Sequence, residues 1–466
     1  MTNAFKKITI MTGITSIALA SIFSLTSCKN SDTEVVNAYD IAVANGYDGS
    51  ESDWLASLKG TDGSDGEDAK TETAYSIYQS LLENTDYTGT YQEFLKEYMG
   101  ENYSIDYYMN KSLMQSVEIV TTFTVTTTQT GFGPGRQQTT TQEQTYQGSG
   151  VFYSIDTTEG DAYIITAFHM IYESTSTSDN GICTNISCYL YGSDEAMSAT
   201  YIGGDISNDI AILKIDDSDV LKDNTMVSEV TFGTYNNLYI GESIYAVGNN
   251  KGQGLSAAEG TLSLLSYNCS YEISDYDATV RSIRYDAANN SGNSGGGVYN
   301  EYGELIGIVD CKMEEEGIEG LQYAVPVSAV EPIAYHVVTN YEKTGSTSNE
   351  KVYLGIVSQD KNSTAYINPE TNMYNTKSEV TVNTINSTSI LNGSGIAVGD
   401  IITKLELNKG ATTNNRVINV YHGYDISEFL YYAEKGDTLT ITYESNGVEH
   451  TIDVTLTYTE AMPEGN

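Results

Sequence analysis

A serine in a run of glycines and small residues is the strongest candidate for chemistry in this chain. Residues 286–298 read Asp-Ala-Ala-Asn-Asn-Ser-Gly-Asn-Ser-Gly-Gly-Gly-Val. Glycines let a chain turn sharply and bring backbone N–H groups close to a reacting oxygen. A serine hydroxyl is a poor nucleophile until a base takes its proton. Ser294 is therefore predicted as a nucleophile if a histidine and a carboxylate can join it.

Suitable partners for Ser294 precede it in the chain. The sequence has four histidines, and His169 ends the apolar run 163–169. Asp209 directly precedes another apolar run, 210–215. In such a set the serine attacks a carbonyl carbon, the histidine transfers the proton and the aspartate fixes the imidazole tautomer. The order His, Asp, Ser differs from that of α/β-hydrolases and subtilisins.

The glycine-rich segment also predicts an oxyanion hole. The N–H groups of Gly292 and Ser294 lie before and at the nucleophile, where they could stabilise a tetrahedral intermediate. Each feature alone has a structural explanation, since glycine-rich loops are common and an aspartate can cap a turn. Together and in this order, the residues favour a catalytic triad.

Five segments occur in a fixed order: 163–170, 208–215, 246–249, 292–296 and 321–326. With these segments the chain resembles HtrA-type (DegP/DegS-like) trypsin-fold serine proteases over about residues 113–460. The resemblance implies a mainly β fold, in which a chymotrypsin-like double β-barrel is followed by a PDZ-like domain. It implies His169, Asp209 and Ser294 as the triad, with no cofactor and no metal.

The barrels are expected at residues 151–215 and 230–330, within a protease domain at 113–342. Ala288 stands six residues before Ser294, where a trypsin-like pocket would carry an aspartate. We therefore expect a small aliphatic residue, not lysine or arginine, before the scissile bond. The acidic segment 310–316 (Asp-Cys-Lys-Met-Glu-Glu-Glu) is interpreted as a solvated charge run.

The PDZ-like domain is expected at residues 351–460, after a helix at 330–338. Tyr353, Leu354, Gly355 and Ile356 match the loop whose N–H groups bind a peptide C-terminus as it adds a strand to a sheet edge. Its further expected pieces are a polar insertion at 358–378, a helix at 425–433 and a hairpin turning at Asn446-Gly447. A small β-rich domain without a peptide site remains the alternative.

The N-terminus predicts export. Residues 1–27 combine Lys6 and Lys7 with an apolar run, as secretory signals do. Leu-Thr-Ser-Cys at 25–28 resembles a bacterial lipobox, which implies a lipid on Cys28. The alternative is an ordinary signal peptide with a cysteine near its cleavage site. We expect a protein anchored by lipid on the outer face of the bacterial cytoplasmic membrane, or secreted.

Residues 28–112 contain a weak internal repeat, with copies at 38–60 and 74–98. Each copy predicts two short helices joined by a polar turn. A small α-helical module of this kind would be a stalk or a partner-binding piece.

With a net charge of −41, the chain is not expected to bind nucleic acid, because a surface this acidic repels phosphates. Four cysteines besides Cys28 permit disulfides in three pairings, which the sequence leaves open. The four are Cys183, Cys188, Cys269 and Cys311.

The predicted function is an exported serine endopeptidase that cleaves unfolded or misfolded exported proteins and recognises protein C-termini. A secreted enzyme attacking particular host or matrix proteins would use the same chemistry. The alternative from another class is a surface binding or scaffold protein with a silent protease domain. HtrA-type enzymes are commonly homo-trimers, and the sequence leaves the oligomeric state open.

Overall fold

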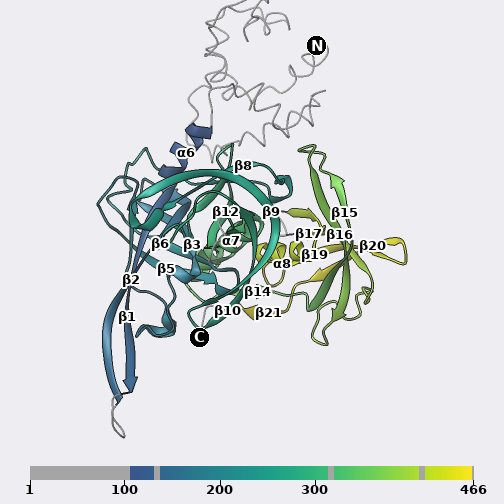
Figure 1. Cartoon of the computed structure of the whole chain (residues 1–466). Helices are drawn as coiled ribbons and strands as arrows, with labels where there is room; N and C mark the ends of the chain where they lie inside the picture. Colours follow the sequence, from purple (N-terminus) through teal and green to yellow (C-terminus); the bar gives the residue numbers. More distant parts are fainter. Residues whose placement is uncertain (1–104, 131–136, 313–319, 409–414, 464–466) are drawn as a thin grey trace, which may run out of the picture. The chain divides into compact units, whose positions relative to one another are not determined.

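The computed structural model describes residues 105–130, 137–312, 320–408 and 415–463. Strands dominate this part of the chain, with a few short helices between them (Figure 1). The signal segment, Cys28 and both repeat copies lie outside the described residues, and α6 (Ile105–Met114) is the first described element. Within the described ranges, no helix has both the length and the apolar character to cross a bilayer.

The first six strands form a closed antiparallel barrel in the order β1-β2-β3-β6-β5-β4. The strands are β1 (Ser116–Thr130), β2 (Gln137–Asp156), β3 (Asp161–Ala167), β4 (Ile186–Leu190), β5 (Met197–Asp205) and β6 (Ile210–Ile215). The barrel thus begins at Ser116, and the expected start at residue 151 is wrong. In β1, Val117, Ile119, Phe123 and Val125 are buried at alternating positions, which directs one face of the strand into the core.

A second ring of six strands follows, in the order β11-β8-β9-β10-β13-β12, and pairing of β11 with β12 closes it. Its strands are β8 (Ser243–Asn249), β9 (Leu255–Ile273), β10 (Tyr276–Tyr285), β11 (Gly297–Asn300), β12 (Glu304–Lys312) and β13 (Gln322–Pro326), and β7 (Thr231–Phe232) joins β12 in parallel. Two closed six-strand barrels in a mainly β chain confirm the predicted fold class.

Helix α7 (Val327–Thr344) leads from the second barrel to a C-terminal domain, which we define as residues 350–463. The helix is longer than the expected 330–338, and its apolar side packs into the core of the first barrel. The short 3-10 turns in the described ranges are η4 (Phe168–Met170), η5 (Asp179–Gly181), η6 (Ile206–Asn208), η7 (Tyr235–Asn237), η8 (Asn250–Gly252) and η9 (Leu430–Tyr432).

The C-terminal domain has a sheet with the strand order β15-β16-β17-β19-β20, with β18 on β17, and a separate pair of β14 with β21. Its elements are β14 (Glu350–Val352), β15 (Ile356–Ile367), β16 (Tyr374–Ile385), β17 (Ile401–Asn408), β18 (Arg416–Asn419), α8 (Gly423–Phe429), β19 (Thr438–Ser445), β20 (Val448–Thr455) and β21 (Thr459–Ala461). The polar stretch 358–378 lies largely within the β15–β16 hairpin. The Asn446-Gly447 hairpin is present between β19 and β20.

Three buried cysteines form no disulfide: Cys183, Cys188 and Cys269. The bridge that the spacing of Cys183 and Cys188 would allow is therefore not formed. Burial raises the pKa of the Cys188 thiol to about 12. These side chains serve as small apolar groups in the core.

A buried ion pair joins β10 to α8. The Arg281 guanidinium donates to Glu428 through Nε at 2.6 Å and Nη2 at 2.7 Å, and both side chains are 9% exposed. The same guanidinium stacks against the rings of Tyr235 and Tyr424, at 4.8 and 4.0 Å from their centroids. Removing one partner of such a pair leaves an uncompensated buried charge.

We therefore expect Glu428→Ala to lower the free energy of unfolding by about 3–5 kcal/mol. The double variant Arg281→Met with Glu428→Met should recover most of this loss, because it removes both charges and keeps apolar volume. Urea unfolding followed by tyrosine fluorescence measures both effects. A single variant as stable as the wild-type protein would contradict the importance of the pair.

Candidate active site

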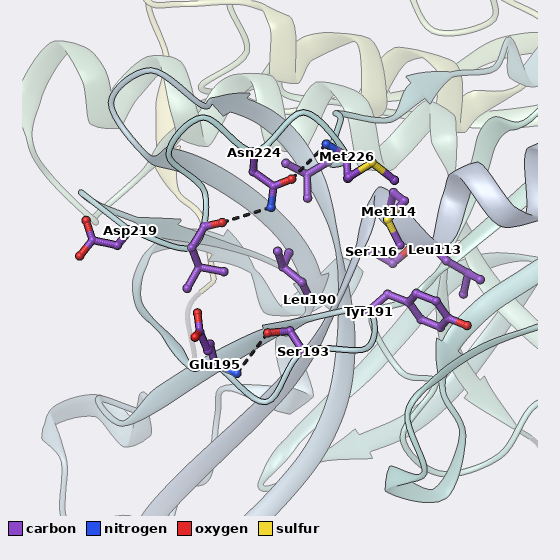
Figure 2. Close-up of a pocket in the computed structure, with 12 residues that line it drawn as sticks. Leu113, Met114, Ser116, Leu190, Tyr191, Ser193, Glu195, Asp219, Asn224 and Met226 are labelled. Carbon is purple, nitrogen blue, oxygen red and sulfur yellow. Dashed lines mark hydrogen bonds between the residues drawn. The ribbon is translucent and has the colours of Figure 1, made fainter.

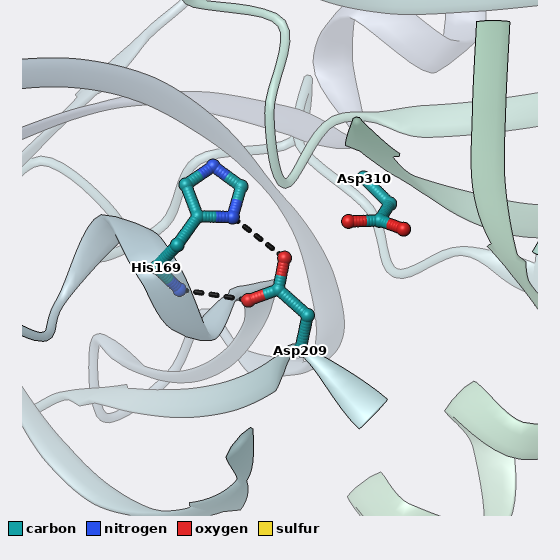
Figure 3. Close-up of side chains that lie close together, drawn as sticks. All are labelled: His169, Asp209 and Asp310. Carbon is teal, nitrogen blue, oxygen red and sulfur yellow. Dashed lines mark hydrogen bonds and ion pairs between the residues drawn. The ribbon is translucent and has the colours of Figure 1, made fainter. Parts of the chain in front are cut away.

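The side chains of His169 and Asp209 form a close pair at the ends of neighbouring strands. His169 lies in η4, directly after β3, and Asp209 follows η6, directly before β6. Asp209 Oδ1 accepts the backbone N–H of His169 at 2.8 Å, and Oδ2 lies 2.6 Å from Nδ1 (Figure 3). Because Oδ2 is an acceptor, Nδ1 carries the hydrogen and Nε2 keeps a lone pair.

The backbone of Asp209 is in the left-handed region, with φ 52° and ψ 38°. Aspartate tolerates this region better than most residues do. A residue stays in this conformation where the surrounding hydrogen bonds impose it. Here the Asp209 carbonyl accepts the N–H of Phe168 at 3.0 Å, and its own N–H donates to Ile206 at 3.2 Å. The side chain is fully buried, so its position relative to His169 is fixed.

Opposing effects act on the pKa of His169. Burial is the largest single effect and lowers the pKa. The charge of Asp209 and the hydrogen bond to Asp209 both raise the pKa, and together they outweigh burial. The net pKa lies above the ordinary value of 6.5. With 28% of its side chain exposed, the imidazole is still reached by solvent.

The segment that carries Ser294 is held by backbone hydrogen bonds to β12. Gly295 N–H donates to the carbonyl of Val309, and Val309 N–H donates to the carbonyl of Gly296, both at 2.8 Å. The N–H groups of Gly292 and Ser294 donate to no acceptor among the described residues, whereas those of Asn293 and Gly295 do donate. Both groups that the sequence predicts for an oxyanion hole are thus left without an acceptor.

Only glycine fits at two positions beside Ser294. Gly292 has φ +99°, and a Cβ there would lie 2.1 Å from the carbonyl oxygen of Asn249. Gly295 has φ +82°, and a Cβ there would lie 2.2 Å from the carbonyl oxygen of Ser149 and 2.9 Å from the nitrogen of Ala167. Gly295 follows Ser294, and Ala167 lies two residues before His169. The contact therefore brings the segments of the serine and the histidine side by side.

Ser149 on β2 connects this segment to both barrels. Its N–H donates to the Ser294 carbonyl at 2.9 Å, and its hydroxyl donates to the Gly292 carbonyl at 2.8 Å. The same hydroxyl accepts the N–H of Asn249 on β8 at 2.8 Å, and the Ser149 carbonyl accepts from Thr166 on β3 at 2.7 Å. One fully buried residue thus makes four bonds around the candidate nucleophile.

The turn before Asp209 is also bonded from the C-terminal domain. The Tyr431 hydroxyl donates to the buried carboxylate of Asp205 and lies 3.1 Å from the Asn208 amide. The N–H of Ile206 donates to the carbonyl of Pro463 at 3.0 Å. These bonds position η6, and through it Asp209.

Asp310 is buried, so the prediction that it belongs to a solvated charge run is wrong. It is 3% exposed on β12, and one donor atom from each of His169, Asp209 and Asp310 lies within 4.8 Å of the others (Figure 3). The prediction failed because Glu314–Glu316 make the segment look hydrophilic, whereas Asp310 still belongs to the strand. These three side chains could also suggest a metal site, but Nδ1 of His169 is already bonded to Asp209.

The remaining predicted site residues lie apart from the His169–Asp209 pair. Ala288 is exposed between β10 and β11. Leu354 is buried, whereas Tyr353, Gly355 and Ile356 are half-buried in the C-terminal domain. A pocket of about 410 Å³ lies next to α6 and β4, and none of the candidate catalytic residues lines it (Figure 2).

We expect Ser149→Ala to loosen the serine-bearing segment, because the Gly292 carbonyl would lose its donor and the Asn249 N–H its acceptor. Unfolding should become easier by about 1–3 kcal/mol. Amide hydrogen exchange followed by mass spectrometry should become faster in a peptide covering 290–297. Ser154→Ala, on the same strand, is the matched control. Equal exchange in both variants would rule out this role for Ser149.

Comparison with known proteins agrees with this geometry. A family model described as a trypsin-like peptidase domain matches residues 148–308. "Serine protease Do-like HtrA" of Lactococcus lactis subsp. lactis (strain IL1403) is 30% identical over 318 residues, covering 66% of this chain and 70% of that protein. The protein of the same description from Bacillus subtilis (strain 168) is 28% identical over 332 residues, covering 70% and 66%.

Among solved structures, an HtrA-type protease, AlgW, with decapeptide is similar with 20% identity and a TM-score of 0.44, covering 77% of this chain and 99% of that one. The match to the Lactococcus protein reaches 30% identity and covers 70% of its length. The chain therefore belongs to the HtrA family of trypsin-like serine proteases.

Proposed function

We propose that this protein is an exported serine endopeptidase that cleaves unfolded or misfolded exported proteins through an acyl-enzyme on Ser294. The observation that carries the proposal is the His169–Asp209 pair, whose Nε2 is left unbonded beside the Ser294 segment. The Ser294 hydroxyl and His169 Nε2 have no hydrogen-bond partner among the described residues. The two atoms are therefore not bonded to each other in this structure, and the mechanism requires them to come within hydrogen-bonding distance when substrate binds.

In this mechanism, Ser294 Oγ attacks the scissile carbonyl carbon as its proton passes to His169 Nε2. The N–H groups of Gly292 and Ser294 would hold the oxyanion, and Asp209 would stay ionised to stabilise the imidazolium. His169 then gives the proton to the leaving amine. Water, activated by the same imidazole, releases the acyl group from Ser294.

The C-terminal domain would act as a PDZ domain that binds peptide C-termini. Two backbone carbonyls of the loop accept hydrogen bonds. Ser389 Oγ donates to the Leu354 carbonyl at 2.6 Å, and Asn386 N–H donates to the Gly355 carbonyl at 2.9 Å. Among the described residues, the N–H groups of Leu354 and Gly355 have no acceptor, as a carboxylate site needs. β15 is an edge strand of its sheet, so a peptide could pair with it.

The N-terminal sequence supports the proposed location. A signal at 1–27 followed by Cys28 would place the enzyme on the outer face of the bacterial cytoplasmic membrane, held by a lipid, or release it from the cell. Unfolded polypeptides and protein C-termini are the proposed partners, and a homo-trimer is the assembly that we would test first.

The Ser294 mechanism predicts that Ser294→Ala abolishes proteolysis. With reduced casein as substrate, the loss should be about a million-fold, since the nucleophile and its base act as a unit. A fluorophosphonate probe should label the mature wild-type protein and not the variant. Ser291→Ala, an exposed serine of the same segment, should keep both activities.

The wild-type protein has two informative failures in this assay. Labelling without cleavage would indicate an enzyme that awaits a peptide at its C-terminal domain or a different substrate. If the protein neither cleaves nor labels when peptides with free C-termini are added, the catalytic proposal is wrong, and a binding or scaffold role replaces it.

The raised pKa of His169 predicts the acid limb of the pH profile. Protonated imidazole cannot accept the Ser294 proton, so kcat/KM should fall as the pH drops through that pKa. The midpoint should lie above about 6.5, the ordinary histidine value. Asp209→Asn removes the charge that raises the pKa, so the midpoint of its residual activity should move to lower pH. A wild-type midpoint below the ordinary value would contradict the pairing.

A further inference from the structure

Asp310 is a buried carboxyl group that the proposed mechanism does not use. It lies on β12, one residue after Val309, whose backbone bonds to Gly295 and Gly296. No lysine or arginine among the described residues forms an ion pair with it. Across the barrel interface it faces Asp209, which lies with His169 within 4.8 Å of it. Two carboxyl groups thus share a site next to His169 (Figure 3).

A count of hydrogens separates the roles of the two carboxyl groups. Asp209 already accepts two hydrogens from His169. The Tyr271 hydroxyl lies 3.1 Å from Asp209 Oδ2 and is also in hydrogen-bonding contact with Asp310 Oδ1. A tyrosine hydroxyl has one hydrogen, so it can donate to only one of these oxygens. Both contacts are hydrogen bonds only if another group supplies a hydrogen.

We propose that Asp310 is a positioning residue that keeps its proton in the working enzyme. Its carboxyl hydrogen is donated to Tyr271 Oη, and the Tyr271 hydrogen is donated to Asp209. The chain of bonds then runs from Asp310 through Tyr271 to Asp209, which holds His169. This role rests on the proposed function, because Asp310 acts on the reaction only through Asp209 and His169.

The groups around Asp310 agree with a protonated acid. The titratable groups that face it are Asp209 and His169 from the first barrel, with Tyr271 and Cys269 from β9. Burial, followed by the charge of Asp209, raises the pKa of Asp310 well above its ordinary value. A hydrogen bond donated by Tyr271 would lower this pKa but does not reverse the net rise. The Ser282 hydroxyl on β10, at 3.4 Å from Oδ2, is only a weak donor.

A neutral Asp310 also suits the chemistry of His169. If both carboxyl groups were ionised, two negative charges would stabilise the imidazolium and hold the histidine in its protonated form. With Asp310 neutral, one charge remains to orient the ring. Tyr271 then has a single direction in which to donate, and Asp209 receives all three of its hydrogen bonds.

The protonation state can be read directly by carbon NMR of protein labelled with ¹³C at the aspartate carboxyl groups. One signal should be at the position of a protonated acid at pH 7 and should be missing in Asp310→Asn. Asp277→Asn, the same change at an exposed position of β10, is the control and should leave that signal in place. Circular dichroism checks that each variant folds. A spectrum in which the Asp310 signal is that of an ionised carboxylate at pH 7 overturns the proposal.

Proteolysis tests the positioning role. Asp310→Ala and Tyr271→Phe should each lower kcat about tenfold or more and leave KM nearly unchanged, because a bond to the charged Asp209 is lost or weakened. Asp310→Asn should recover most of the loss in kcat, since its amide can donate to Tyr271. The pH–rate profile of Asp310→Asn should also lack any change at alkaline pH that follows Asp310 ionisation. Wild-type kcat in Asp310→Ala would overturn the role.

The two measurements separate this inference from the proposed function. The carbon spectrum needs no catalysis, and Ser294→Ala protein serves as well as the wild-type protein. If the wild-type enzyme is inactive but the Asp310 signal is that of an acid, the Ser294 mechanism fails and the protonated pair stands. If the enzyme is active and the signal is that of a carboxylate, the proposal for Asp310 fails and the Ser294 mechanism stands.

Discussion

The geometry of the site depends on how Ser149 joins the two barrels. Its four hydrogen bonds connect β2 to Thr166, to Asn249 and to the carbonyls of Gly292 and Ser294. The histidine and aspartate come from the first barrel and the serine from the second, so no local structure can align them. A rigid connection is needed at the junction, and a buried hydroxyl that both donates and accepts supplies it.

The second constraint is the burial of carboxyl groups around one turn. Asp205 bonds to the Tyr431 hydroxyl, and Asp209 bonds to His169 and Tyr271. Each carboxylate is buried, and a buried charge is tolerated only where donors satisfy it. Some of these donors come from the C-terminal domain and some from the second barrel. The position of Asp209 therefore depends on three parts of the chain, although Asp209 itself belongs to the first.

The sequence could predict that His169 and Asp209 pair, and could single out Ser294 as a candidate, because each lies in a short segment with its own character: an apolar strand before or after it, or a run of glycines. The mainly β fold was predictable for the same reason. The sequence did not indicate Ser149 or Asp310 as site residues. Ser149 matters because it contacts residues more than a hundred positions away, and Asp310 because it is buried beside Asp209. A serine between two glycines, and an aspartate at the end of an apolar strand, give no local signal that distinguishes them from turn and surface residues.

The charges around His169 make the stability of the fold and the catalytic activity depend on pH in opposite directions. For His169 the folded-state pKa is raised, so its pairing stabilises the fold below the unfolded pKa of about 6.5, and this stabilisation is lost as the pH rises through the folded value. Asp310 has the same sign, because the folded state holds its proton at a pH where the unfolded chain would release it. Both groups therefore favour the fold at lower pH, whereas catalysis requires a neutral His169. In the proposed arrangement Asp310 keeps its proton where His169 is neutral, and a neutral neighbour would limit how far the histidine pKa rises. The buried acid thus reduces the conflict that Asp209 creates when it holds the imidazole.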